Sequence, residues 1–266
     1  MMEFIEANRK LWNERVDTHV NSEFYDNDTF LAGRSSLNDI ELALLGDVKG
    51  KRVLHLQCHF GQDSLSLARM GAKVTGVDLS DKAILKAQEL NEKLGLDAEF
   101  ICSDVMKADE VLAQEYDLVF TSYGTIGWLP ELNTWAKVID HCLKPGGKFL
   151  IVDFHPVLWM FDANFKFFEH SYFNAGVIQE ESVDSYVENS ELEESMEEYG
   201  WNHSLEELFQ SLLSRNLMIS HFKEYDYSPY NCFNRTVKMD KGYQIEGLEG
   251  KLPMVYALGA EKPKSL

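Results

Sequence analysis

Two acidic residues, Asp78 and Asp104, come at or just after the ends of short apolar, β-branched runs, Lys73–Asp78 and Asp97–Cys102. Such runs indicate buried strands of a parallel sheet. Doubly wound sheets bind their ligands at the carboxyl ends of the strands. A carboxylate at that edge can accept hydrogen bonds from ribose hydroxyls or from an adenine amino group. The sequence therefore predicts a nucleoside-containing ligand, with Asp78 at the ribose and Asp104 at the adenine.

The residues that follow these acids belong to the same predicted site. The backbone N–H of Val105 can donate to a ring nitrogen of the base, and Leu79 follows Asp78 directly. Each acid also has a structural alternative, because aspartate is a common helix N-cap. Their joint occurrence at two successive strand ends favours the ligand.

Two histidines, His155 and His203, are candidates for a general base. His155 follows the predicted strand Lys148–Asp153, and His203 stands at the start of a predicted helix. Imidazole titrates near neutrality and can accept a proton there. The structural alternatives are that His155 orders the turn at Pro156 and that residues 202–204 cap the helix.

Aromatic residues near the predicted site form a candidate substrate pocket, at Tyr123, Trp128 and Trp201. Core packing is the alternative for Tyr123 and Trp128. Cys58 and His59 are adjacent on an extended segment, so their side chains point to opposite faces and do not converge as a catalytic or metal-binding pair. The four cysteines form no CxxC pair and no zinc spacing, which predicts reduced thiols, no disulfide framework and no metal site.

The elements that must position these residues alternate between strands and helices, as in βαβ units. Parallel strands are predicted at Arg52–Gln57, Lys73–Asp78, Asp97–Cys102, Asp117–Ser122 and Lys148–Asp153. Ser80 and Asp81 open a helix, and Leu143–Gly147 predicts a helix stop and a turn. Further helices and strands are predicted at Glu6–Arg15, Ser36–Leu45, Ser204–Arg215, Met218–Tyr225 and Met254–Gly259.

The spacing of these elements predicts one enlarged domain with two additions. Residues 1–50 form an N-terminal helical cap, and residues 51–153 and 201–266 form the doubly wound domain. Residues 154–200 are far longer than an ordinary connection of roughly 2–6 residues. Their first half is aromatic and their second half is acidic, which predicts an inserted lid with a solvated rim.

Composition narrows the class of partner. The 266 residues carry 44 acidic and 25 basic side chains, a net charge of -19 that repels nucleic acid. No apolar run approaches the ~18 residues that a membrane-spanning helix needs. The acidic N-terminus differs from a secretory signal, so we expect a cytoplasmic protein with a small-molecule substrate.

The order of these motifs resembles the class I S-adenosylmethionine-dependent methyltransferases, most of all their bacterial small-molecule branch. The resemblance covers roughly residues 51–153 and the last helix and strands. It rests on the turn ending at Gly61, on Asp78, and on the segments Asp104–Val105, Tyr116–Phe120 and Leu143–Gly147. It implies a mostly parallel seven-stranded α/β sheet with helices on both faces, an antiparallel last strand, and S-adenosylmethionine as cofactor.

The resemblance also implies that the turn after the first strand binds the cofactor, through His55, Gln57 and Gly61. The family usually has an acid and two glycines where this chain has His55, Gln57 and His59. A water or the carbonyl of Thr121 would then bind the cofactor's amino group in place of the acid.

The sequence thus favours methyl transfer to a small molecule by in-line displacement. Two alternatives come from other functional classes. A nicotinamide-dependent oxidoreductase would also use Asp78 at a ribose, although GxGxxG is absent. A binding module would sense S-adenosylmethionine or its product without turnover.

Overall fold

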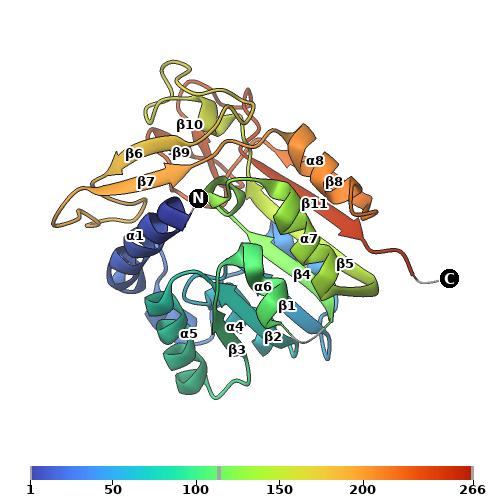
Figure 1. Cartoon of the computed structure of the whole chain (residues 1–266). Coiled ribbons are helices and arrows are strands. Elements are labelled where there is room, and N and C mark those ends of the chain that lie inside the picture. Colours follow the sequence, from blue (N-terminus) through green and yellow to red (C-terminus); the bar gives the residue numbers. More distant parts are fainter. Residues whose placement is uncertain (1, 113–114, 265–266) are drawn as a thin grey trace.

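A computed structural model describes residues 2–112 and 115–264. Its centre is a seven-stranded sheet of order β3-β2-β1-β4-β5-β11-β8 (Figure 1). The first five strands pair in parallel, and β11 is antiparallel to both β5 and β8. The strands are β1 (Arg52–Leu56), β2 (Lys73–Asp78), β3 (Glu99–Cys102), β4 (Tyr116–Ser122), β5 (Leu143–Phe154), β8 (Met218–Tyr225) and β11 (Val255–Glu261). The predicted fold class is confirmed.

Helices cover both faces of the sheet because successive residues of each strand point to opposite sides. In β1, Val53 packs in one cluster with residues of α3 (Asp39–Leu45) and α4 (Gln62–Arg69), whereas Leu54 and Leu56 belong to the other cluster. That second cluster is formed largely with α7 (Leu132–Cys142) and α8 (Leu205–Leu213). The remaining helices of the domain are α5 (Asp81–Leu94), packed on the α4 side, and the short α6 (Ala108–Val111).

The first helix, α1 (Met2–Asn21), lies outside the sheet and beside a two-stranded hairpin, β6 (Ile178–Ser182) and β7 (Met196–Gly200) (Figure 1). Asn8 of α1 binds both backbone groups of Tyr199: Nδ2 donates to the carbonyl at 2.7 Å, and Oδ1 accepts from the N–H at 3.0 Å. Arg15 donates to Ser182 Oγ at 2.7 Å and to Glu198 Oε2 at 2.8 Å. These contacts hold the hairpin against α1.

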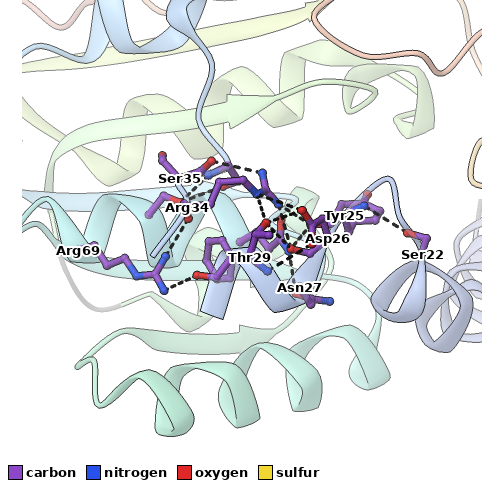
Figure 2. A network of polar contacts seen from close by, with 12 residues as sticks. Ser22, Tyr25, Asp26, Asn27, Thr29, Arg34, Ser35 and Arg69 are labelled. Carbon is purple, nitrogen blue, oxygen red and sulfur yellow. Dashed lines mark hydrogen bonds and ion pairs between the residues drawn. The ribbon is translucent and has the colours of Figure 1, made fainter. Parts of the chain in front are cut away.

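The segment between α1 and α3, which contains the short helix α2 (Asn27–Leu31), is held by two arginines (Figure 2). Arg34 donates to the Tyr25 and Asp26 carbonyls and to Thr29 Oγ1. Arg69 of α4 donates to the carbonyls of Arg34 and Phe30. The Arg34 bonds hold the segment in its own conformation, and the Arg69 bonds hold it against α4.

Most predicted elements are present with shifted ends. Ser80 and Ser204 are the N-caps of α5 and α8, as predicted. The helix stop predicted at Leu143–Gly147 is confirmed, because α7 ends at Cys142. The segment after it belongs to β5 but pairs irregularly with β4: Leu143 pairs with Tyr116 and Lys148 with Leu118, and Gly146 between them is at φ 79°. The hairpin β6–β7 and a second hairpin, β9 (Thr236–Lys238) with β10 (Tyr243–Ile245), were not predicted. Among the described residues, no helix is long and apolar enough to span a membrane.

Candidate functional site

A cavity of about 810 Å³ lies at the carboxyl ends of β1, β2 and β4. Small-molecule sites commonly measure about 300–1,000 Å³. One side, here called the strand-end wall, consists of residues that follow these strands. The opposite side, the outer wall, is contributed by residues 2–50 and 154–200. Residues of the outer wall that line the cavity include Trp12, Arg15, Tyr25, Trp159, Tyr186 and Glu198.

The turn after β1 carries two non-glycine residues in the left-handed region, Gln57 at φ 56° and His59 at φ 50°. Residues other than glycine rarely adopt this conformation, and the backbone is strained where they do. Both residues line the cavity, as predicted for Gln57. Gln57 Nε2 donates to the Thr125 carbonyl at 2.7 Å, while its Oε1 is buried without a partner. That orphan acceptor suits a donor from a bound ligand.

Gly61 ends the same turn and is the N-cap of α4, at φ 84°. A Cβ added there would lie 2.8 Å from the ring of Phe100, so glycine is required on both conformational and steric grounds. Gly61 also lines the cavity, at the position that the sequence predicted.

Asp78 stands at the end of β2 and organises this turn. Its Oδ2 accepts from the backbone N–H of His59 at 2.7 Å, and its Oδ1 accepts from Ser80 N–H at 2.9 Å. Burial raises the pKa of Asp78, against the effect of these N–H donors. Each carboxylate oxygen has a second lone pair. Asp78 lines the cavity beside Leu79, so it can still accept from ligand hydroxyls there.

Asp104 and Val105 line the cavity next to this pair. Asp104 is the N-cap of a short 3-10 helix, since its Oδ1 accepts from Met106 N–H at 2.9 Å. The helix N-cap, which was the structural alternative for Asp104, is therefore confirmed. Its Oδ2 has no partner within residues 2–112 and 115–264, so the capping role leaves one oxygen for a ligand.

His55 lines the cavity, as predicted, but it is almost fully buried in a polar network that the sequence did not reveal. Its Nδ1 lies 2.8 Å from Ser64 Oγ and its Nε2 lies 3.3 Å from Ser122 Oγ. Burial lowers the pKa of His55 to about 4, partly offset by Asp63. Ser122 Oγ also donates to Asp63 Oδ2 at 2.9 Å. Asp63 lines the cavity. It therefore places a carboxylate beside the turn in which His55 stands where the family usually has an acid.

The end of β4 differs from the prediction. Thr121 is fully buried, its Oγ1 donates to the Leu56 carbonyl at 3.1 Å, and it does not line the cavity. The residues that follow it do: Thr125 takes its place at the wall. The loop from Gly124 is ordered by the buried Asp153, which accepts from Thr125 N–H at 3.1 Å and from Thr125 Oγ1 at 2.8 Å. Asp153 was missed because it reads as an ordinary strand residue.

The two histidines predicted as bases lie in different places. His155 is outside the cavity lining, because it faces β8: its Nε2 lies 2.9 Å from Glu224 Oε1, and its Nδ1 accepts from Val157 N–H at 3.2 Å. This geometry matches its structural alternative. His203 does line the cavity, but its Nε2 donates to the Leu129 carbonyl at 2.8 Å and its Nδ1 lies 3.1 Å from Glu207 Oε2.

The three predicted pocket aromatics all line the cavity. Tyr123, at φ 44°, is another left-handed residue, and its hydroxyl donates to Glu41 Oε2 at 2.8 Å. Burial raises the pKa of Glu41 to about 7. The ring of Trp128 lies edge-on to Trp12 of α1, with centroids 5.1 Å apart. Trp201 follows the hairpin, and its backbone N–H donates to the Gly127 carbonyl at 2.8 Å.

A histidine pair joins the two walls. His59 Nε2 lies 2.9 Å from His19 Nδ1 of α1, and His19 Nε2 lies 2.9 Å from Ser185 Oγ of the hairpin loop. Burial, the largest cause in each case, lowers the pKa of His59 to about 3 and that of His19 to about 2. Both rings are therefore neutral. Sequence reasoning missed the pair because 40 residues separate its members.

No group of three His, Cys, Asp or Glu side chains is arranged to hold a metal ion in the part of the chain that the structure describes. Cys58 is buried beneath the turn, and burial raises its pKa well above the ordinary value. Its thiol is thus unsuited to act as a thiolate nucleophile.

Comparison with known proteins agrees with this geometry. Residues 53–147 match the methyltransferase domain family model. The crystal structure of a putative S-adenosylmethionine-dependent methyltransferase from Listeria monocytogenes matches 84% of this chain and 95% of its own, with TM-score 0.58 and 20% identity. The chain has the class I methyltransferase fold.

Two curated relatives match part of this chain and part of their own length. An uncharacterized methyltransferase of Synechocystis is 32% identical over 49% of this chain and 60% of its own. The ubiquinone biosynthesis O-methyltransferase of Bordetella avium is 32% identical over 39% of this chain and 43% of its own. The chain thus spans about half the length of these relatives.

Proposed function

We propose that this chain is an S-adenosylmethionine-dependent methyltransferase that acts on a small-molecule acceptor. The observation that carries the proposal is the position of Asp78. Its carboxylate fixes the turn after β1 through His59 N–H and still lines a cavity large enough for the cofactor. That is the place where an acid accepts from ribose hydroxyls. The methyltransferase domain match covers the same turn and strand.

The residues present fit this cofactor. Asp78 would hold the ribose, Asp104 and Val105 the adenine, and the buried, unpartnered Gln57 Oε1 would accept from a donor of the methionine part. Asp63 would take the ammonium group, which the sequence assigned to Thr121 or to water. Its side chain lines the cavity two residues after Gly61, and Ser122 orients it.

When bound, the cofactor supplies a methyl group on a sulfonium sulfur, which is a good leaving group. The protein then has to align the acceptor at ~3–3.5 Å and exclude water. The outer wall suits both tasks, because Trp12, Trp159 and Tyr186 line the cavity opposite the strand ends. We assign residues 1–50 the role of a cap and residues 154–200 that of a lid.

The acceptor is a small molecule rather than a nucleic acid. The net charge of -19 repels phosphate backbones. Acidic residues of the hairpin region, Glu180, Glu181 and Asp184, also line the cavity. These charges oppose an anionic acceptor as well.

Calorimetry with S-adenosylmethionine, S-adenosylhomocysteine and NAD tests the cofactor. We expect the two methionine-derived compounds to bind and NAD not to bind. NAD binding alone would favour the oxidoreductase and contradict the proposal. Turnover is then tested by release of S-adenosylhomocysteine in a metabolite extract, with mass identification of the methylated product.

A binding module without turnover is the second candidate. The observation in its favour is that Gln57 and His59 stand where close backbone approach to the cofactor ordinarily requires glycine. Tight binding of S-adenosylmethionine without any methylated product from the extract would favour this candidate over the enzyme.

A further inference from the structure

We propose that His59, backed by His19 and Ser185, takes the proton from a hydroxyl-bearing acceptor during methyl transfer. This inference rests on the proposed function and names both the base and the class of acceptor. It replaces His155, which does not line the cavity, and it competes with His203, whose two ring nitrogens both face protein atoms.

The backbone conformation at His59 favours glycine, which indicates that the histidine side chain serves a function. At φ 50°, glycine would fit with less strain than histidine. The only hydrogen bond of its ring within the described residues runs from Nε2 to His19. Its Nδ1 is neither bonded nor among the buried polar atoms that lack partners, so it is open to the cavity that His59 lines.

The relay continues from this open nitrogen through His19 to Ser185 of the hairpin loop, which also lines the cavity. A neutral imidazole has one donor and one acceptor nitrogen. With Nδ1 of His59 as acceptor, His59 Nε2 donates to His19 Nδ1, and His19 Nε2 donates to Ser185 Oγ. Ser185 lies partly exposed in the hairpin loop. A chain of hydrogen bonds therefore joins His59 to the hydroxyl of a partly exposed residue.

The proton balance of the reaction follows from this path. The acceptor oxygen forms a bond to the methyl carbon as the carbon–sulfur bond breaks, and sulfur keeps that electron pair. The hydroxyl proton passes to His59 Nδ1, and the Nε2 proton passes to His19 Nδ1. The His19 Nε2 proton passes to Ser185 Oγ as that hydroxyl gives its own proton to water. Both rings are neutral before and after the shift.

The surroundings of the pair favour such a concerted shift over a charged imidazolium. The pKa of His59 is lowered by burial first and then by the charge of Arg15. The other titratable groups that face the pair are Asp78, bonded to His59 N–H, and Tyr25 and Tyr186, whose rings pack on His19. The relay therefore works without either ring becoming charged between about pH 5 and 8.

The relay also selects the acceptor atom. A hydroxyl oxygen becomes a strong nucleophile only as its proton leaves, whereas a neutral amine already presents its lone pair. Trp12, Tyr25 and Phe60 surround the His59 ring with centroids 5.4, 5.7 and 4.6 Å away. A hydroxyl on an uncharged, ring-bearing molecule suits these walls.

The test uses S-adenosylmethionine with a ¹³C-labelled methyl group and a metabolite extract. The chemical shift of the labelled carbon separates O-methyl from N-, S- and C-methyl products. For the wild-type protein we expect an O-methyl product. His59→Gly should lower turnover roughly 10²- to 10⁴-fold while affinity for S-adenosylhomocysteine stays nearly unchanged, and added imidazole should restore part of the rate. His59→Asn, which tolerates the left-handed conformation, should lose turnover equally.

Two further variants separate a relay from a structural role. His19→Gln can bond to His59 but cannot pass a proton, so we expect at least about a tenfold loss of turnover. The exposed His141→Asn serves as the matched control and should behave as wild type. Turnover should also stay level from pH 5 to 8.

Three results would overturn this inference while leaving the proposed function intact: an N-, S- or C-methyl product, near-normal turnover of His59→Gly, or loss of turnover in His203→Asn alone. A loss of turnover that only follows a loss of S-adenosylhomocysteine affinity would make His59 a binding residue and overturn it too. If the wild-type protein methylates nothing, the proposed function fails and the inference fails with it.

Discussion

The two walls of the cavity are built by different kinds of contact. On the strand-end wall, Asp78 and Asp104 bond to backbone groups 2 to 19 residues away. On the outer wall, Asn8 and Arg15 bond to the hairpin across 167 to 191 residues. Strand topology alone brings the first set together, whereas the second set depends on how α1 and the hairpin dock. The comparison indicates that cofactor binding and acceptor enclosure can be altered separately.

The largest effect is expected at Glu41, which joins the walls through Tyr123. Burial raises its pKa from 4.5 to about 7, so between these values the folded state holds a proton that the unfolded state has lost. Stability from this group is complete below about pH 4.5 and is lost as the pH rises through 7, by on the order of 3 kcal/mol. Urea unfolding at pH 5 and 7.5 measures the difference, and Glu41→Gln should remove it. An unchanged pH dependence in the variant would show that Glu41 is not the group responsible.

Cofactor binding should depend on the strand-end wall. Asp78→Ala removes a charged acceptor, a loss of ~1.5–3 kcal/mol, or roughly ten- to over a hundredfold in affinity for S-adenosylhomocysteine. Asp104→Ala should lie at the lower end, because only Oδ2 is available to a ligand. Calorimetry measures both, with the exposed Asp97→Ala as control. Wild-type affinity in both folded variants would refute the site assignment.

Docking of the hairpin should depend on Asn8. Asn8→Ala removes both bonds to the Tyr199 backbone in a buried setting, which costs roughly 1–3 kcal/mol of stability. Affinity for S-adenosylhomocysteine should remain. Thermal unfolding with and without the ligand checks this, and the exposed Asn21→Ala is the matched control. If ligand affinity fell in step with stability, the two walls would not be separable.

The smallest effect is expected at Gln57. Gln57→Gly relieves left-handed strain but loses the bond to Thr125, so stability should change by less than about 1 kcal/mol. Gly61→Ala in the same turn should destabilise clearly more, since its Cβ meets Phe100. Denaturant unfolding of both variants ranks them. If Gln57→Gly lost more stability than Gly61→Ala, the Gln57 side chain rather than Gly61 would hold the turn.

The sequence by itself determined the sheet and the strand-end wall. The strand run Lys73–Asp78 and the end residues Asp78, Asp104 and Gly61 stand where they were predicted, because a period of two and turn-forming residues are local signals. Parallel topology then places all carboxyl ends at one edge. Thr121, whose carbonyl was expected at the cofactor's amino group, is fully buried and does not line the cavity; Ser122, the next residue of β4, and the loop beyond it do.

Only the tertiary structure decided which side chains meet across the cavity. Asp63 beside Ser122, Glu41 beneath Tyr123, and His19 against His59 are pairs separated by 40 to 82 residues. His155 turned out to face Glu224 rather than the cavity. Such pairings depend on the packing of whole elements, and neither residue type nor spacing in the chain records them. The local sequence set the strands and turns, and the docking of α1 and the hairpin set what the cavity can do.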